Sequence, residues 1–177
     1  MKSILSLDIS SSAIGWAVIS FDADYKLLDY GSILPSKKIK NIQERFEDLE
    51  SKLSKLVSAN NYDYIVVEDY ASFFKGGRSN SRTIIILALF NEFTKYFLYK
   101  KTGVLPEKIS VISIRSILSK KFSKKIRSKD ETFEFIKENE PGFSVRLNRN
   151  NNIRKECYDE ADAIATGIAY YFKLTEV

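Results

Sequence analysis

The first twenty residues constrain the fold more than any other stretch, because they hold two strand-like runs joined by a very short turn. Apolar and small residues alternate over 3–9 and again over 14–20, and the small polar sequence SSSA separates the two runs. This pattern predicts an early β-hairpin. The first run also contains an aspartate, Asp8. Burying a lone carboxylate costs several kcal/mol unless it is paired, hydrogen-bonded or bound to a metal, so the fold must give Asp8 a partner.

The rest of the chain has the pattern of an α/β protein. Further strands are expected over 25–34, 62–69 and 108–114, and helices over 41–61, about 82–101, 128–140 and about 156–174. Early hairpins followed by strand–helix crossovers favour a five-stranded mixed sheet, three antiparallel strands and then parallel ones, flanked by helices. The chain has 177 residues, no repeat and no evident linker, so we expect a single domain over 1–177.

Two helices carry more specific signals. Ser128 and Glu131 have the spacing of a capping box, which predicts the start of the helix over 128–140. The helix over 82–101 is apolar on more than one face through IIILALF, so the sheet alone does not cover it. Such a helix is typical of a dimer surface or of a central core. The asparagine-rich stretch that ends at Lys155 is expected to be a loop.

The rarest residue types exclude whole classes of site. The chain has no histidine and a single cysteine, Cys157. A Ser-His-Asp triad, a histidine general acid, a histidine-ligated zinc, a cysteine-cluster zinc site and an internal disulfide are therefore excluded. Catalysis must depend on carboxylates, lysines, tyrosines or a metal bound by oxygen, and such hard ligands suit Mg²⁺ or Mn²⁺. No apolar run predicts a membrane span and the start lacks a secretion signal, so we expect a cytoplasmic protein without a membrane partner.

Positive charge is concentrated in two segments. The formal net charge is +5, and eleven of the 28 basic residues lie in 115–129 and 146–155, neither of which contains an acid. Clustering of this kind favours binding to a phosphate backbone, and the alternative is a pair of solvated surfaces. Nucleic acid is the partner that this distribution favours.

Acidic residues stand out at three places along the chain. Asp8 lies in the first strand, Glu68 and Asp69 end the apolar strand YIVV, and Asp159 and Asp162 lie in the last helix. A spacing of three places the last two on one helix face, and strand-end acids can converge with them at one end of a sheet. Each acid also has a structural interpretation: a turn carboxylate, a strand-end acid paired with a lysine, or acids stabilised by the start of a helix.

A group of four carboxylates would repel one another and titrate abnormally unless cations neutralise them. Two Mg²⁺ ions roughly 4 Å apart can hold the attacking water and the leaving oxygen of a phosphodiester in line. This chemistry needs no histidine. It also suits a basic protein, because lysines and arginines outside the site can hold the rest of a nucleic acid.

Taken in order, these motifs resemble the RuvC-type Holliday junction resolvases of the ribonuclease H-like superfamily. The matching stretches are LDISSSAIGWAVI with Asp8 and Gly15, IVVEDYASFF with Glu68, and YDEADAIATGIAYY with Asp159 and Asp162. The resemblance spans nearly the whole chain. It implies a ribonuclease H-like fold and a homodimeric crossover junction endodeoxyribonuclease. Such an enzyme nicks four-way DNA junctions in symmetric pairs, with two Mg²⁺ ions in each active site and Mn²⁺ as a substitute.

The same resemblance assigns roles to residues. The metal ligands and catalytic residues would be Asp8, Glu68, Asp159 and Asp162. The loop after Glu68 would reach the centre of the junction, where aromatic residues stack on an unpaired base and basic residues hold phosphate, or it could simply pack as an ordinary loop. The DNA-binding candidates in that loop and in the two basic segments are Tyr70, Phe73, Phe74, Lys75, Arg78, Arg115, Lys120, Lys121, Lys124, Lys125, Arg127, Arg149 and Arg154.

The sequence departs from the bacterial pattern in three ways. Asp69 directly follows Glu68, so strand alternation lets only one of the two acids face the metal, and the motif favours Glu68. DISSS stands where the family usually has Pro-Gly after the aspartate, and 115–129 is unusually rich in lysine. A phage or viral relative, acting in an infected cell, is therefore a second interpretation beside a bacterial one. A flap or fork nuclease and a noncatalytic junction-binding protein remain alternatives. An ATP-handling protein of the actin-like and sugar-kinase superfamily is disfavoured by the glycine-poor hairpin and the short chain.

Overall fold

A computed structural model describes residues 1–10, 13–36, 38–39, 41–58, 61–69 and 81–175. The strands are β1 (Lys2–Ile9), β2 (Ile14–Phe21), β3 (Tyr25–Ile33), β4 (Tyr64–Glu68) and β5 (Glu107–Ile109). The helices are α1 (Ile42–Ser58), α2 (Ser81–Thr102), α3 (Val111–Lys121), α4 (Lys129–Asn139) and α5 (Lys155–Thr175). None of the helices in these ranges is long and apolar enough to cross a membrane.

The strands form one mixed sheet in the order β3-β2-β1-β4-β5. β1 pairs with β2 and β2 with β3 in antiparallel fashion, whereas β4 runs parallel to β1 and β5 runs parallel to β4. The predicted hairpins and the change to parallel pairing are thereby confirmed. Because β1 and β4 are parallel neighbours, their carboxyl ends lie at the same edge of the sheet.

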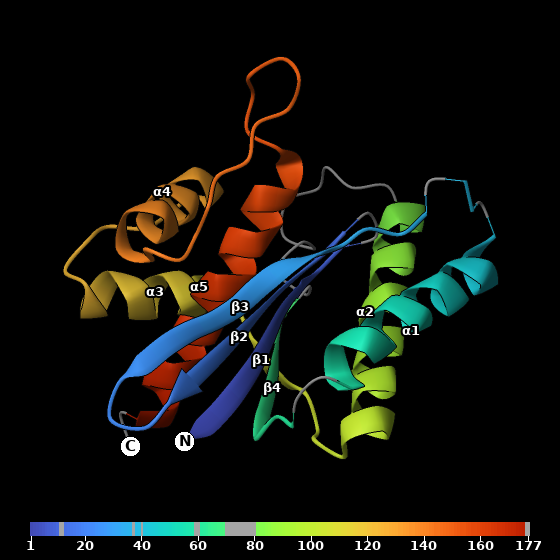
Figure 1. The fold of residues 1–177 in the computed structure, drawn as a ribbon, viewed down its shortest axis with the longest axis horizontal. Coiled ribbons are helices and arrows are strands. Elements are labelled where there is room, and N and C mark those ends of the chain that lie inside the picture. Colours follow the sequence, from blue (N-terminus) through green and yellow to red (C-terminus); the bar gives the residue numbers. More distant parts are fainter. Residues whose placement is uncertain (11–12, 37, 40, 59–60, 70–80, 176–177) are drawn as a thin grey trace.

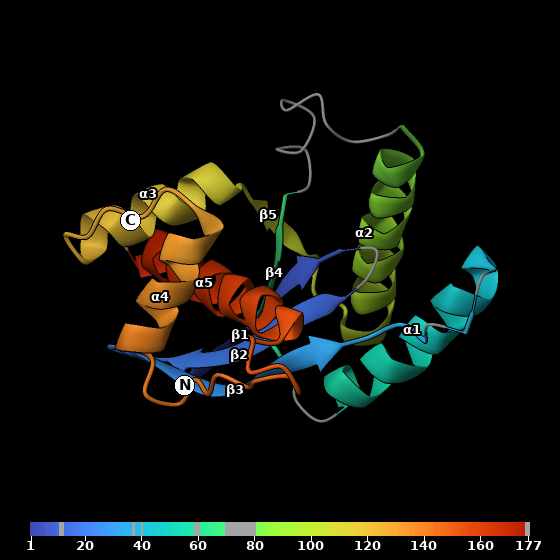
Figure 2. The same ribbon diagram turned by 90° about the horizontal axis from the view of Figure 1, so that it is seen from above.

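Helices cover both faces of this sheet (Figures 1 and 2). One core joins the sheet to α3, α4 and α5, and the other joins it to α1 and α2. Side-chain alternation along the central strand divides its residues between the two cores. Ile4 contributes to the α5 core, whereas Leu5 and Leu7 contribute to the other. The Ser6 hydroxyl donates to the Ala163 carbonyl of α5 at 2.8 Å, which shows the same alternation.

Two glycines allow α5 to approach the sheet closely. A Cβ atom on Gly15 of β2 would lie 2.0 Å from the Asp159 carbonyl oxygen, and one on Gly167 of α5 would lie 2.6 Å from the Ile19 side chain. A side chain at Gly15 would meet fixed backbone, whereas one at Gly167 would require the Ile19 and Ser6 side chains to shift. Backbone therefore contacts backbone where the first turns of α5 cross β2.

The strand predicted over 108–114 is wrong beyond its first two residues. β5 ends at Ile109, and α3 begins at Val111 after Ser110, whose hydroxyl accepts from the Ser113 N–H at 3.1 Å. The β-branched residues of this run favour a strand locally. The segment forms a helix instead because a helix buries Ile114 and Leu118 on one face. The predicted capping box of Ser128 is confirmed at the start of α4.

The long helix α2 is buried on one side and open on the other. Phe90 and Leu98 have no exposed surface, whereas Ile85 is 59% and Tyr96 is 63% exposed. In the described part of the chain, these outer apolar side chains have no covering element. The helix is therefore a core helix on one side only, and the dimer surface that the sequence indicates for the other side stays a prediction.

Candidate active site

Three elements bring four acids to one end of the sheet. Asp8 lies at the end of β1, Glu68 at the end of β4, and Asp159 and Asp162 in the first turns of α5. We call these four residues the acidic cluster. Asp8 alternates in phase with Ser6, which contacts α5, and it lies directly opposite Gly15 in the antiparallel register. The side chain of Asp8 thus points to the same face that carries the helix acids.

Strand alternation also separates the two acids that end β4. Val66 contributes to the α5 core and Val67 to the other, so Glu68 lies on the α5 face. Asp69 follows the strand, and its N–H donates to the Ile109 carbonyl at 2.8 Å. The two candidates are therefore not equivalent, and Glu68 is the one that faces the helix acids.

A lysine that the sequence did not single out enters the acidic cluster. The Lys129 ammonium lies 3.1 Å from Asp159 Oδ1 and 2.8 Å from Asp162 Oδ2. The capping box of α4 fixes Lys129 as the first residue of that helix, and α4 packs against α5. The sequence predicted this helix start, but nothing in it linked the start to acids 30 residues further along the chain.

The electrostatics of the cluster show that its members act on one another. Burial raises the pKa of Asp8 well above its usual value, and the Glu68, Asp162 and Asp159 carboxylates raise it further. Burial, then the Asp162 charge, raise the pKa of Glu68 to about 7. Burial likewise raises the pKa of Asp162, against the opposing effect of Lys129.

Two cations partly compensate this negative charge. Burial alone disfavours the charged form of Lys129, but the surrounding carboxylates, Asp162 foremost, outweigh it and raise the lysine pKa. The charge of Arg115 on α3 lowers the pKa of both Glu68 and Asp162, so it acts on the cluster as well. Four carboxyl groups meet only two cations, and the raised pKa values of Asp8, Glu68 and Asp162 show that their negative charge is not fully compensated, which favours binding of a divalent cation.

The side-chain arrangement is not that of a closed metal site. Within the described ranges, no three carboxylates or other potential ligands of this kind converge tightly enough to hold a metal ion. The Lys129 ammonium instead bridges Asp159 and Asp162. The donor chemistry still fits a hard divalent cation, because every candidate ligand is a carboxylate oxygen.

The other predicted DNA-binding residues are dispersed. Tyr70, Phe73, Phe74, Lys75 and Arg78 lie outside the described residues. At the far end of α3, the Lys121 ammonium lies 5.1 Å from the centre of the Phe172 ring. Phe172 is about 20 Å along α5 from Asp159, so Lys121 does not reach the acidic cluster.

The remaining basic candidates lie on exposed surface. Lys124 pairs with Glu138 of α4. Of the basic candidates in 115–129, Arg115 is the one whose charge acts on the cluster. The other exposed ones are Lys120, Lys125, Arg127, Arg149 and Arg154.

Comparison with known proteins identifies the fold. No protein family and no curated protein matches the sequence. Among solved structures, Thermus thermophilus RuvC in complex with a Holliday junction substrate is similar, with a TM-score of 0.73 at 11% identity, covering 98% of this chain and 96% of that one. A second T. thermophilus RuvC structure gives 0.70 at 12% identity, with coverage of 98% and 96%.

A third structure is more distant. The yeast mitochondrial Holliday junction resolvase Ydc2 gives a TM-score of 0.63 at 11% identity, covering 94% of this chain and 76% of that one. These similarities show that the chain has the RuvC-type, ribonuclease H-like fold, as its ordered motifs predicted.

Proposed function

We propose that this chain is a structure-specific endodeoxyribonuclease that resolves four-way DNA junctions by paired symmetric nicks. The observation that carries the proposal is the acidic cluster, four carboxylates from β1, β4 and α5 that face one side of a RuvC-type sheet beside two cations. Once its carboxyl groups are ionised, the cluster would repel a bare phosphodiester, so it makes chemical sense as a place for cations that in turn hold the phosphate.

Asp8, Glu68, Asp159 and Asp162 would hold the metal, two Mg²⁺ ions or Mn²⁺ in their place. When bound, these ions would activate a water molecule and neutralise charge on the phosphate. The carboxylates would have to turn toward a common centre, and Lys129 would have to leave Asp159 and Asp162.

The cationic residues of the chain have their own part in the reaction. The Lys129 side chain is 45% exposed, so its ammonium can move from the carboxylates to an oxygen of the scissile phosphate. There it would stabilise the charge that develops as the bond breaks. Arg115, whose guanidinium donates to the Arg127 carbonyl at 3.0 Å, would hold a neighbouring phosphate from a fixed position.

Binding of the junction would extend beyond the cluster. The basic residues of α3 and of the following loop, Lys120, Lys121, Lys124, Lys125 and Arg127, would contact the DNA backbone. Tyr70, Phe73 and Phe74 would stack on bases near the junction centre, with Lys75 and Arg78 on phosphates. The whole chain, 1–177, would act as one nuclease domain in the cytoplasm of a bacterium or of an infected cell.

Two such domains would act together as a homodimer. The outer face of α2 exposes Ile85, Leu89, Tyr96 and Tyr99. Contiguous exposed apolar surface of this kind marks an interaction site. A second copy placed there would present two acidic clusters to the two strands that must be nicked.

A cleavage assay tests the proposal. An end-labelled four-way junction, a matched flap and a linear duplex are incubated with Mg²⁺ or with EDTA. Paired symmetric nicks in the junction alone, lost in EDTA and in Asp8→Asn and Glu68→Gln, are expected. Asp69→Asn is the matched control, because it removes the adjacent acid outside the α5 face and should keep the activity.

Other outcomes would contradict the proposal. Equal cutting of flap and junction would make the protein a general branched-DNA nuclease. Junction binding without cutting in Mg²⁺ or Mn²⁺ would make it a noncatalytic junction-binding protein.

A further inference from the structure

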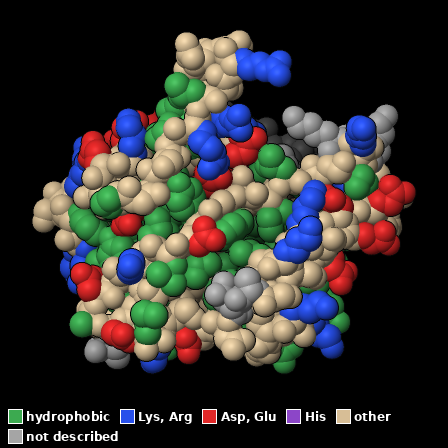
Figure 3. All heavy atoms as spheres, in the orientation of Figure 1, with side chains coloured by type: hydrophobic (Ala, Val, Ile, Leu, Met, Phe, Trp, Pro, Cys, Tyr) green, Lys and Arg blue, Asp and Glu red, His purple; other side chains and the backbone are tan. Residues whose placement is uncertain are grey.

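A long connection stands out beside the acidic cluster. Residues 140–154 link the end of α4 to the start of α5 without a helix or a named strand. Connections of this length are uncommon in compact domains and usually functional. Figure 1 shows part of it rising beyond the start of α5, and Figure 3 shows basic side chains on this projection. We call residues 146–154 the prong.

The prong is ordered by its own hydrogen bonds. Leu147 and Ile153 form an isolated antiparallel bridge. Inside it, the Asn148 side-chain oxygen accepts from the Asn150 N–H at 2.8 Å and from the Asn152 N–H at 3.1 Å. The Asn148 N–H donates to the Asn152 carbonyl at 2.8 Å. The tip is therefore a closed turn with a defined shape.

An ion pair ties the base of the prong to α5. Arg146 Nη2 lies 2.5 Å from Glu160 Oε1, and the Glu160 side chain is only 1% exposed. The other Glu160 oxygen has no hydrogen-bond partner in the described chain. Arg146 thus compensates the charge of a buried carboxylate. Breaking this ion pair would leave the Glu160 charge buried and unpaired, which is strongly destabilising.

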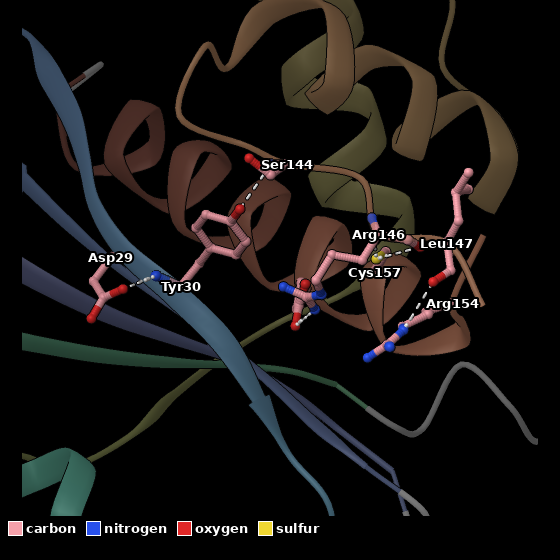
Figure 4. A network of polar contacts seen from close by, with 8 residues as sticks. Asp29, Tyr30, Ser144, Arg146, Leu147, Arg154 and Cys157 are labelled. Carbon is pink, nitrogen blue, oxygen red and sulfur yellow. Dashed lines mark hydrogen bonds and ion pairs between the residues drawn. The ribbon is translucent and has the colours of Figure 1, made fainter. Parts of the chain in front are cut away.

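Further contacts tie the same segment to the sheet (Figure 4). The Ser144 N–H donates to the Tyr30 hydroxyl of β3 at 2.8 Å, and the Arg146 N–H donates to Cys157 Sγ at 3.4 Å. Arg154 Nε donates to the Leu147 carbonyl at 3.2 Å across the base. The segment that leads into the prong is therefore held by β3, and the base of the prong is held by α5.

The charge of the prong is complementary to phosphate. Arg146, Arg149 and Arg154 are basic, Lys155 follows, and the stretch contains no acid. Arg149 is exposed, and its side chain makes no hydrogen bond or ion pair with the described part of the chain. Asp159 lies one helical turn after Lys155, the residue that follows the prong, so this end of the prong lies about 6–8 Å, along the helix axis, from the acidic cluster.

We propose that the prong is a preformed phosphate-binding element that binds the backbone of the DNA strand next to the scissile bond. This rests on the proposed nuclease function. Arg149 contacts the backbone, and Arg146 with Glu160 acts as a positioning pair that fixes the prong relative to Asp159. Because the prong is ordered before DNA binds, little conformational freedom is lost on binding.

Binding measurements test the contact made by Arg149. In an Asp8→Asn background, junction affinity is measured by fluorescence anisotropy over a series of salt concentrations, with Arg149→Ala, Arg149→Lys and the control Lys55→Ala, an exposed lysine on α1. Arg149→Ala should weaken binding about three- to tenfold and reduce the salt slope by about one, Arg149→Lys should restore the slope, and Lys55→Ala should change neither. An unchanged slope and affinity for Arg149→Ala would overturn the contact.

Single-turnover cleavage at saturating protein tests the positioning pair. The double variant Arg146→Met with Glu160→Met removes both charges, so neither is left buried and unpaired, and thermal unfolding checks that it folds. We expect a cleavage rate at least tenfold lower with an unchanged salt slope, whereas Arg149→Ala keeps the saturated rate. If the double variant does not fold, Arg146→Lys, which keeps the charge but shortens the contact, should show a smaller loss of rate.

The two proposals fail in different ways. A folded double variant, or a folded Arg146→Lys, that cleaves at the wild-type rate would overturn the positioning pair and leave the nuclease function standing. A wild-type protein that binds junctions but does not cut them would overturn the nuclease function, whereas the anisotropy series would still decide whether the prong contacts DNA.

Discussion

Replacing Glu68 by glutamine should make the metal-free protein more stable at pH 8, although the change removes a proposed ligand. Burial and the Asp162 charge raise the pKa of Glu68 from 4.5 to about 7. A carboxylate with a raised pKa contributes stability that is fully present below pH 4.5 and is lost as the pH rises through about 7. Above that pH, the ionised Glu68 carboxylate costs more free energy in the folded protein than in the unfolded chain, where water solvates it.

The magnitude follows from that interval. The difference between 4.5 and about 7 corresponds to at most about 3 kcal/mol at pH 8. The pKa of about 7 already includes the attraction of Lys129 and Arg115, but glutamine still buries a polar amide in place of the carboxyl, so we expect a net gain of about 1–3 kcal/mol. For a chain of 177 residues this raises the Tm by about 2–12 °C.

The assay is thermal unfolding followed by circular dichroism in EDTA at pH 5, 6, 7 and 8. Glu68→Gln should exceed the wild type at pH 8, and the advantage should shrink toward pH 5. Asp69→Asn should follow the wild type at every pH. Added Mn²⁺ should raise the Tm of the wild type more than that of Glu68→Gln. A lower Tm for Glu68→Gln at pH 8 would refute the electrostatic argument.

Three further changes test other parts of the structure. Gly15→Ala inserts a Cβ against the Asp159 backbone, so it should cost about 1–3 kcal/mol in a urea titration and lower cleavage as well. Lys129→Met should reduce cleavage but tighten Mn²⁺ binding about tenfold by calorimetry at pH 8, because the competing ammonium is gone. Tyr96→Glu on α2 should shift a homodimer toward monomer in sedimentation, and an unchanged mass would place the dimer contact elsewhere.

Much of the fold followed from local pattern. Alternation in the first hairpin and in YIVV predicted the strands that carry Asp8 and Glu68, and the spacing of Asp159 and Asp162 placed both on one helix face. These are properties of period and register, which a sequence displays directly.

What the sequence did not predict depends on tertiary packing. Lys129 reaches Asp159 only because α4 packs across α5, and Arg146 reaches Glu160 only because the prong folds back on the same helix. The strand prediction for 108–114 fails beyond Ile109 because a short apolar run can be buried either as a strand or as a helix. The elements that pack against it decide between the two.

The contact between Gly15 and Asp159 divides sequence changes into those that would move the acids, such as a side chain at Gly15, and those that would not. Across this contact, the spacing between β2 and the first turn of α5 is set by main-chain atoms, and Asp8 lies directly opposite Gly15. Substitutions among the core side chains further along α5 can therefore accumulate and alter stability while the acids keep their relative positions. A lineage could exchange most of its interior and retain the same reactive geometry, provided that one position never acquires a side chain.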